Sequence, residues 1–279
     1  GAMAIGYRIG EREIIYPPQP AGTPFAPGDT LRGGGLIAHP HNCEDARVST
    51  EDEKVNYHGT LARSLTVPVY IDEQEGIAVF ALTSNLIPDN MRHDSDDGML
   101  TLVNYKLQKD GGYTTTVQTF NFGKNSLYTG DAYHPYLNTK KSRPLRLQVG
   151  TESMDFAEII QKEYPGPGRK GYREALKAIR KTGFFDPMSK YTEGIETPFP
   201  NLTLFTQFYN VTLAPLYGFD LNRASFGVWT QTFRYFCLEA VEGQDASYDP
   251  RDPAKQPSYT EIKPGESSVL AISIKAELT

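Results

Sequence analysis

Two of the few histidines in this chain lie two residues apart, beside a carboxylate. Residues 39–41 read His-Pro-His, and Glu44 follows shortly after. In an extended segment, side chains two residues apart point to the same side, so His39 and His41 would lie next to each other. Two imidazoles and a carboxylate are ligands that suit iron, manganese, nickel or zinc. The pattern predicts a site for one divalent transition metal formed by His39, His41 and Glu44, with the distant His134 as a further ligand.

The spacing of these residues resembles the first motif of the cupins, in which a glycine, five residues, His-x-His and then a glutamate supply metal ligands. Five residues separate Gly33 from His39, as in that motif, but Glu44 follows His41 after two residues instead of three or four. Downstream, Gly130, His134 and Asn138 imitate part of the second cupin motif without its proline. The resemblance implies a metal-dependent enzyme. The alternative is that these histidines belong to a surface loop beside Pro40 and bind nothing.

A second group with potential chemistry is a stripe of basic residues between positions 170 and 181. The apolar residues of this segment recur at helical spacing, which places the basic side chains on the opposite face of a helix. Such a stripe contacts an anionic ligand or partner, or is simply solvated. The candidate contact residues are Lys170, Arg173, Lys177 and Arg180.

Familiar catalytic motifs are absent from the chain. There is no Gly-x-Ser-x-Gly sequence, no phosphate-binding Walker loop and no dinucleotide fingerprint. The leading hypothesis from the sequence is therefore a non-catalytic binding or assembly protein that uses a proline-rich N-terminal arm and loops for contacts. Its expected partner is a second copy of the chain or another protein, with no nucleic acid and no cofactor. The metal-dependent, cupin-like enzyme stays as the alternative.

The elements that would position these residues are mostly strands. Runs of alternating apolar and polar residues with turn residues between them predict strands, and Lys109-Asp110-Gly111-Gly112 predicts a tight hairpin. One interlude differs, because residues 155–182 carry apolar side chains at helical spacing and predict two short helices. The expected fold is mainly β, an antiparallel two-sheet β-sandwich of jelly-roll type with a two-helix insertion. The expected strands cover 9–16, 65–71, 76–83, 99–108, 113–122, 145–149, 201–213, 225–241 and 270–278, the last of them half-exposed near an edge.

The chain is expected to form one sandwich domain over residues 61–279, with the helical insertion at 153–183. Residues 1–60 are expected to form an irregular arm and loop, rich in proline and glycine, that packs on this domain. Two cysteines in 279 residues exclude a disulfide framework. Their scarcity slightly favours a reducing compartment. Secretion stays open, since the start Gly1-Ala2-Met3-Ala4 resembles the remainder of a cleaved tag. No apolar run is long enough for a membrane span.

Overall fold

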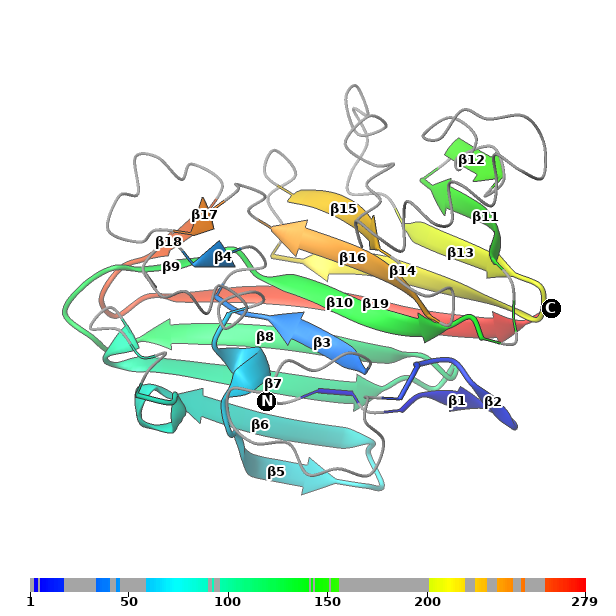
Figure 1. Cartoon of the computed structure of the whole chain (residues 1–279). Coiled ribbons are helices and arrows are strands. Elements are labelled where there is room, and N and C mark those ends of the chain that lie inside the picture. The colour runs from blue at the N-terminus through cyan, green and yellow to red at the C-terminus, as the bar shows by residue number, and fades with distance from the viewer. Residues whose placement is uncertain are drawn as a thin grey trace.

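The computed structural model of the chain is built almost entirely from β-strands (Figure 1). The helical structure of the described part consists of two 3-10 turns, η2 (Leu61–Arg63) and η3 (Ser84–Leu86), and a single 3-10 residue, Asp96. No helix there has the length and hydropathy that a membrane crossing requires. The structure describes residues 3–4, 6–17, 34–40, 44–45, 59–89, 92, 96–140, 142, 144–150, 152–155, 201–218, 224–229, 235–242, 247–248 and 259–279.

Nearly half of the described strands join one large antiparallel sheet. Its nine strands follow the order β12-β11-β13-β14-β19-β8-β7-β6-β5. Alternate residues are buried in strands such as β8 and β13, because one face of the sheet covers the core and the other faces outward. The strands are β5 (Val67–Asp72), β6 (Ile77–Thr83), β7 (Met99–Leu107), β8 (Tyr113–Asn121), β11 (Pro144–Val149), β12 (Glu152–Asp155), β13 (Leu202–Thr206), β14 (Tyr209–Tyr217) and β19 (Ser267–Leu278).

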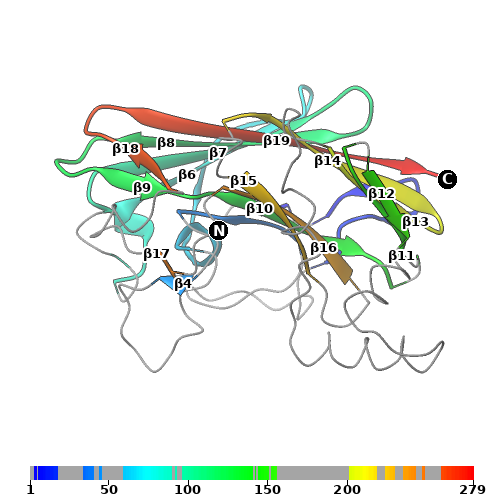
Figure 2. The same cartoon turned by 90° about the horizontal axis from the view of Figure 1, so that it is seen from above.

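A smaller sheet forms the second layer of the sandwich, beneath the large sheet in Figure 2. Its four strands follow the order β15-β16-β10-β3, and they are β3 (Gly35–Ala38), β10 (Ala132–Asn138), β15 (Ala224–Trp229) and β16 (Tyr235–Glu242). Three two-stranded pairs complete the described strands: β1 (Arg8–Ile9) with β2 (Arg12–Glu13), β4 (Glu44–Asp45) with β17 (Ser247–Tyr248), and β9 (Leu127–Thr129) with β18 (Thr260–Ile262).

The main core lies between the two sheets. It joins Val117 and Ile272 of the large sheet to Tyr133 and Phe236 of the small one in a single cluster of buried side chains. The other face of the small sheet is buried as well, because Tyr136 and its neighbours form a separate cluster there. Every residue of β16 is buried, so both faces of this strand are covered, as its apolar composition indicates.

The predicted antiparallel sandwich is confirmed, and so is the hairpin after Lys109, because β7 and β8 pair from Met99↔Asn121 to Leu107↔Tyr113. The topology differs from a jelly roll of two Greek keys, since the large sheet is mainly a series of neighbouring hairpins. The single strand predicted for residues 201–213 is two strands. Thr206 turns the chain there, because its hydroxyl donates to the carbonyl of Tyr209 and accepts the Tyr209 N–H.

The prediction for the C-terminal strand was wrong in its position. β19 lies at the centre of the large sheet, between β14 and β8. Its alternation arises because one side of the strand faces the core and the other side faces outward, which is equally true of a central strand. The edges of this sheet are instead β12 and β5, and β5 accommodates Pro68 beside a register shift, as edge strands do.

The helical insertion is not seen in the described residues. Ser153 and Asp155, which the sequence suggests as the start of the first helix, belong to β12. The remainder of the predicted helix pair lies outside the described residues. Of the predicted N-terminal arm, Ile14 and Ile15 are fully buried in the main core and β3 is a strand of the small sheet.

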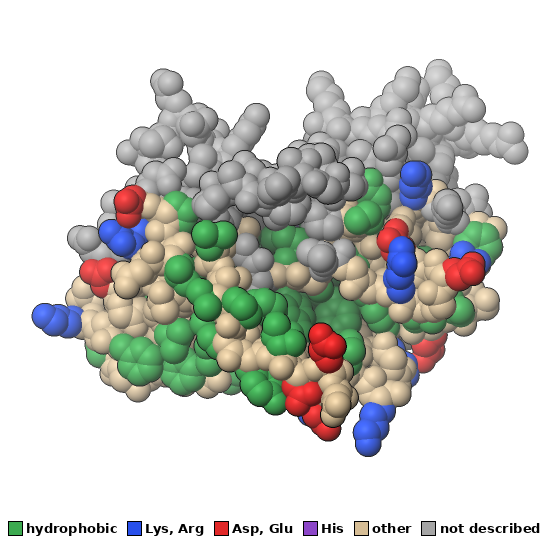
Figure 3. All heavy atoms as spheres, turned by 90° about the horizontal axis from the view of Figure 1, so that it is seen from below, with side chains coloured by type: hydrophobic (Ala, Val, Ile, Leu, Met, Phe, Trp, Pro, Cys, Tyr) green, Lys and Arg blue, Asp and Glu red, His purple; other side chains and the backbone are tan. Residues whose placement is uncertain are grey.

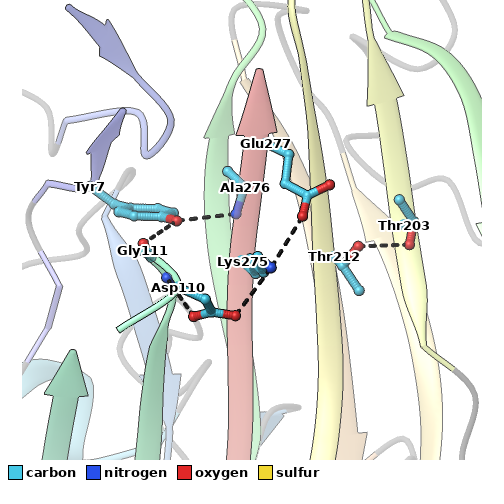
Figure 4. Close-up of polar contacts among 9 residues, drawn as sticks. Tyr7, Asp110, Gly111, Thr203, Thr212, Lys275, Ala276 and Glu277 are labelled. Atoms are coloured by element: carbon cyan, nitrogen blue, oxygen red, sulfur yellow. Dashed lines mark hydrogen bonds and ion pairs between the residues drawn. The ribbon is translucent and has the colours of Figure 1, made fainter. Parts of the chain in front are cut away.

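Tyr7 ties the N-terminal segment to the centre of the large sheet (Figure 4). The pairing of β8 with β19 ends at Tyr113↔Ile274. Beyond that point the Ala276 N–H donates to the Tyr7 hydroxyl at 3.1 Å, and this hydroxyl donates to the Gly111 carbonyl at 2.8 Å. The hydroxyl of Tyr7 thus continues the ladder where the backbone of β8 turns away.

We expect Tyr7→Phe to lower the free energy of unfolding by about 1–3 kcal/mol, because the Ala276 N–H then loses its partner in a buried position. Urea unfolding of the variant beside wild type measures the change. Tyr70→Phe is the matched control, since Tyr70 is exposed and its hydroxyl contacts only the exposed Asp72 side chain in the hydrogen bonds described. An equal loss in both variants would contradict the role of Tyr7.

Candidate active site

A histidine and a glutamate face each other across two strands of the small sheet. The printed partners Tyr133↔Ala240 and Tyr136↔Cys237 set the register of β10 and β16 and place His134 opposite Glu239. The Nε2 atom of His134 lies 2.8 Å from Oε1 of Glu239, and the two side chains are 4% and 10% exposed. A polar pair this far from solvent is retained only when its members satisfy each other.

The pair lies on the face of the small sheet that points away from the large sheet. In β16, Phe236 and Leu238 belong to the core between the sheets, whereas Cys237 belongs to the cluster on the opposite face. Glu239 shares the orientation of Cys237 because it lies two residues further on, and His134 shares that of Tyr136. The local sequence makes these segments strands because both are continuous apolar runs interrupted by a single ionisable side chain.

Aromatic side chains surround the imidazole on this face. The ring of Tyr136 stacks on His134 with centroids 4.9 Å apart and an interplanar angle of 27°. Tyr235 packs on Tyr136 at 5.1 Å, and Tyr16 packs on Tyr235 at 5.3 Å. This row of rings fixes the plane of the imidazole and leaves it little freedom to rotate away from Glu239.

Cys237 lies on the same face as the pair but is not equipped as a nucleophile. Burial, and secondarily the negative charge of Glu239, raises the pKa of the Cys237 thiol well above its usual value. The thiolate, which is the reactive form, is therefore scarce at neutral pH. The arrangement is suited to moving protons between His134, Glu239 and a bound hydroxyl group.

The structure separates two histidines that the sequence joins in one metal site. His39 lies at the end of β3 on the face toward the core, where its Nδ1 is 2.7 Å from Oδ1 of Asp131 and its Nε2 is 2.9 Å from the Thr101 hydroxyl. His134 points to the opposite face of the same sheet, so these two imidazoles do not meet. Both ring nitrogens of His39 already have protein partners.

The structure describes only some of the other residues that the sequence suggests for a metal or anion site. Glu44 is in the short strand β4, and His41 lies outside the described residues. Within the described ranges no group of three or more His, Cys, Asp or Glu side chains could hold a metal ion. The proposed anion-contact residues Lys170, Arg173, Lys177 and Arg180 also lie outside what the structure describes, and their role stays a prediction.

Sequence reasoning missed Glu239 and grouped His134 with His39, from which the structure separates it. A signal was present, since Glu239 interrupts the run Tyr-Phe-Cys-Leu-Glu-Ala-Val and His134 interrupts Ala-Tyr-His-Pro-Tyr-Leu. An ionisable residue inside a buried strand needs a partner, and each of these could serve the other. The pairing of two strands about 100 residues apart in sequence was not visible.

No family model matches the sequence, and no curated protein matches it either. Solved structures do share its fold. A galactose mutarotase related enzyme from Lactobacillus acidophilus superposes with a TM-score of 0.59 at 10% identity, covering 96% of this chain and 88% of that chain. A protein of Escherichia coli K12, provisionally named an aldose 1-epimerase, gives 0.57 at 13% identity, with 99% and 93% covered. A galactose mutarotase-like protein from Lactobacillus casei gives 0.54 at 12% identity, with 95% and 90% covered.

These likenesses overturn the leading hypothesis from the sequence. A non-catalytic assembly protein was expected because catalytic motifs were missing, but the structures that share the fold carry the names of carbohydrate-processing enzymes. The absence of familiar motifs was poor evidence, because an acid–base pair on neighbouring strands leaves no contiguous motif in a sequence. The chain has the galactose mutarotase-like β-sandwich fold.

Proposed function

We propose that the protein is a carbohydrate-processing enzyme that interconverts the anomers of an aldose, with His134 and Glu239 as its acid–base pair. The observation that carries the proposal is the buried contact of 2.8 Å between these side chains, on one face of a mutarotase-like sandwich. Buried ionisable pairs occur at catalytic sites and also in structural contacts such as His39–Asp131, and the mutarotase-like fold is what favours a catalytic role for this pair.

The chemistry of anomer interconversion needs what this pair supplies. The sugar ring opens when the anomeric hydroxyl loses its proton and the ring oxygen gains one. The open aldehyde then rotates about its C1–C2 bond and closes from the other face, with the two proton transfers reversed. A carboxylate is suited to accept the first proton and an imidazolium to donate the second. Both steps move only protons, so the proposed reaction requires no redox cofactor.

The residues around His134 and Glu239 also support a catalytic role for this pair. The buried Tyr136 holds the imidazole by stacking, and the buried Tyr235 and the half-buried Tyr16 continue this row of rings beside it. Removal from water strengthens the interactions of the pair with a developing charge on the substrate.

The direct test follows the rate at which a freshly dissolved aldose reaches its anomeric equilibrium. Polarimetry, or integration of the anomeric proton signals by NMR, is applied to a panel of neutral aldoses and aldose phosphates with and without the purified protein. We expect at least one sugar to equilibrate faster in proportion to protein concentration, with an unchanged final anomer ratio. Rates equal to those in buffer for every sugar of the panel would contradict the proposal.

A further inference from the structure

A cavity lies at the β5–β7 end of the large sheet, away from the His134–Glu239 pair. It has a volume of about 460 Å³ and lies between the segment around Met3 and Tyr7 and the strands β5, β6 and β7. Figure 3 shows this face of the molecule, where hydrophobic side chains line a hollow. Acidic side chains lie beside the hollow. The small sheet does not extend to this end, since in Figure 1 its edge strand β3 overlaps β7 and β8, whereas β6 and β5 lie below it.

Aromatic rings make up much of the wall. Phe80, Tyr105, Tyr113 and Tyr7 line the cavity and form a continuous series, in which neighbouring ring centroids lie 6.4, 6.3 and 5.3 Å apart. The first and last pairs meet nearly edge to face, at 75° and 85°. Rings in several orientations around one space offer both faces and edges to the apolar body of a ligand, and they also attract a cation that lies near them.

The hydroxyl groups of these tyrosines are already used by the protein. Tyr7 bonds to Gly111 and Ala276, and Tyr113 bonds to the hydroxyl of Tyr133. Tyr105 bonds to the backbone of Ala4. A ligand therefore meets their ring carbons, so the cavity is poorly suited to a sugar and well suited to an apolar body.

Charge at the mouth of the cavity has one sign. Among the described residues, its lining includes the carboxylates of Asp72 and Glu73 and no lysine or arginine. Hydrogen bonds from the backbone of its own turn, chiefly from the Glu75 N–H, hold the pKa of Asp72 below its usual value. Asp72 is therefore ionised at neutral pH, and its carboxylate lies beside an apolar space without a basic side chain in the lining.

From the aromatic wall, the occupied hydroxyl groups and the acidic mouth, we propose that this cavity binds a small organic cation, an alkylammonium or quaternary ammonium compound with an apolar body. The apolar body packs against Phe80, Tyr105 and Leu107, and the cationic group lies at Asp72 and Glu73. The site is separate from the proposed sugar site and does not depend on its activity.

The test uses benzyltrimethylammonium as the probe and tert-butyl benzyl ether as its neutral counterpart of similar shape. Ligand-observed NMR titration at low and at high salt measures the binding of each to the whole chain. We expect saturable binding of the cation that weakens with salt, and weaker binding of the ether. No saturable binding of the cation, or equal binding of both compounds, would overturn the proposal.

Three variants locate the site. Glu73→Gln should weaken binding of the cation by about threefold to fivefold, the factor expected for a partly exposed charge contact. Ala78→Leu fills the cavity and should abolish binding, and Leu107→Ser removes an exposed part of the apolar wall and should weaken it. Thermal unfolding confirms that each variant is folded.

Glu75→Gln is the matched control, because Glu75 is an exposed acid of the same turn that does not line the cavity. It should bind the cation as wild type does. If Glu75→Gln weakened binding as much as Glu73→Gln does, binding would depend only on the net negative charge of the turn. Unchanged binding in folded Ala78→Leu would place the cation elsewhere, and either result overturns the proposal. Sugar equilibration should be the same in Glu73→Gln and wild type.

Discussion

Replacement of Glu239 by glutamine is expected to lower the catalysed rate of anomer interconversion by about 10²–10⁴-fold, the usual contribution of a positioned general acid or base. Glutamine keeps the size of the side chain and can still hydrogen-bond with His134, but it cannot accept a proton from the sugar. The effect should therefore fall mainly on kcat and leave KM close to its wild-type value. Initial rates of anomer exchange across a range of sugar concentrations measure both constants.

Glu242→Gln is the matched control for this variant. Glu242 is also a buried glutamate of β16, and it accepts a hydrogen bond from the Thr260 hydroxyl. It lies three residues beyond Glu239, so its side chain leaves the strand on the other face. We expect activity close to wild type in this variant. Full activity in Glu239→Gln, or an equal loss in both variants, would contradict the assignment of Glu239 as the base.

The largest effect on stability is expected from His39→Ala. His39 joins Asp131 at the start of β10 to Thr101 of β7, so its imidazole connects the two sheets inside the core. Its removal leaves the Asp131 carboxylate buried without this partner, and breaking such a pair costs about 3–5 kcal/mol. Because a domain of this kind is stable by only about 5–15 kcal/mol, much of the total would be lost.

Urea unfolding monitored by circular dichroism measures this loss. The exposed pair of Arg8 and Glu13, at 2.9 Å, supplies the control, since Arg8→Ala should change the free energy of unfolding by less than about 1 kcal/mol. The double variant His39→Leu with Asp131→Leu should be more stable than His39→Ala, because no buried charge then lacks its partner. A His39→Ala variant as stable as wild type would show that the contact between His39 and Asp131 contributes little to stability.

The strands of this fold are largely predictable because their signal is local. Alternation within Met99–Leu107 and the glycines after Asp110 specify both the strands and their hairpin. The central place of β19 is not predictable in this way, since the same alternation fits any strand with one covered face. The split at Gln207 and Phe208 was missed because a hydroxyl of Thr206, and no glycine or proline, makes the turn.

The candidate site illustrates the same limit. His134 and Glu239 meet because β10 and β16 are neighbours in the small sheet, and nothing in either segment specifies the other. The opposite orientation of His39 and His134 likewise depends on the register Ala38↔Ala132, which pairs strands far apart in the chain. Sequence reasoning named one member of the pair, His134, but as a candidate metal ligand. Its partner, Glu239, can be identified only from the folded structure, in which β10 and β16 are neighbours.

The central position of β19 has a consequence for the synthesis of this protein. Strands β5 to β8 and strands β11 to β14 form the two halves of the large sheet, and residues 267–278 join them. While the ribosome is still producing the preceding residues, β8 and β14 each present an unpaired edge that the finished protein lacks. Such edges associate readily with other strands, and pairings between distant segments form slowly. We therefore expect nascent chains that have not yet reached β19 to depend on chaperones more than the completed protein does.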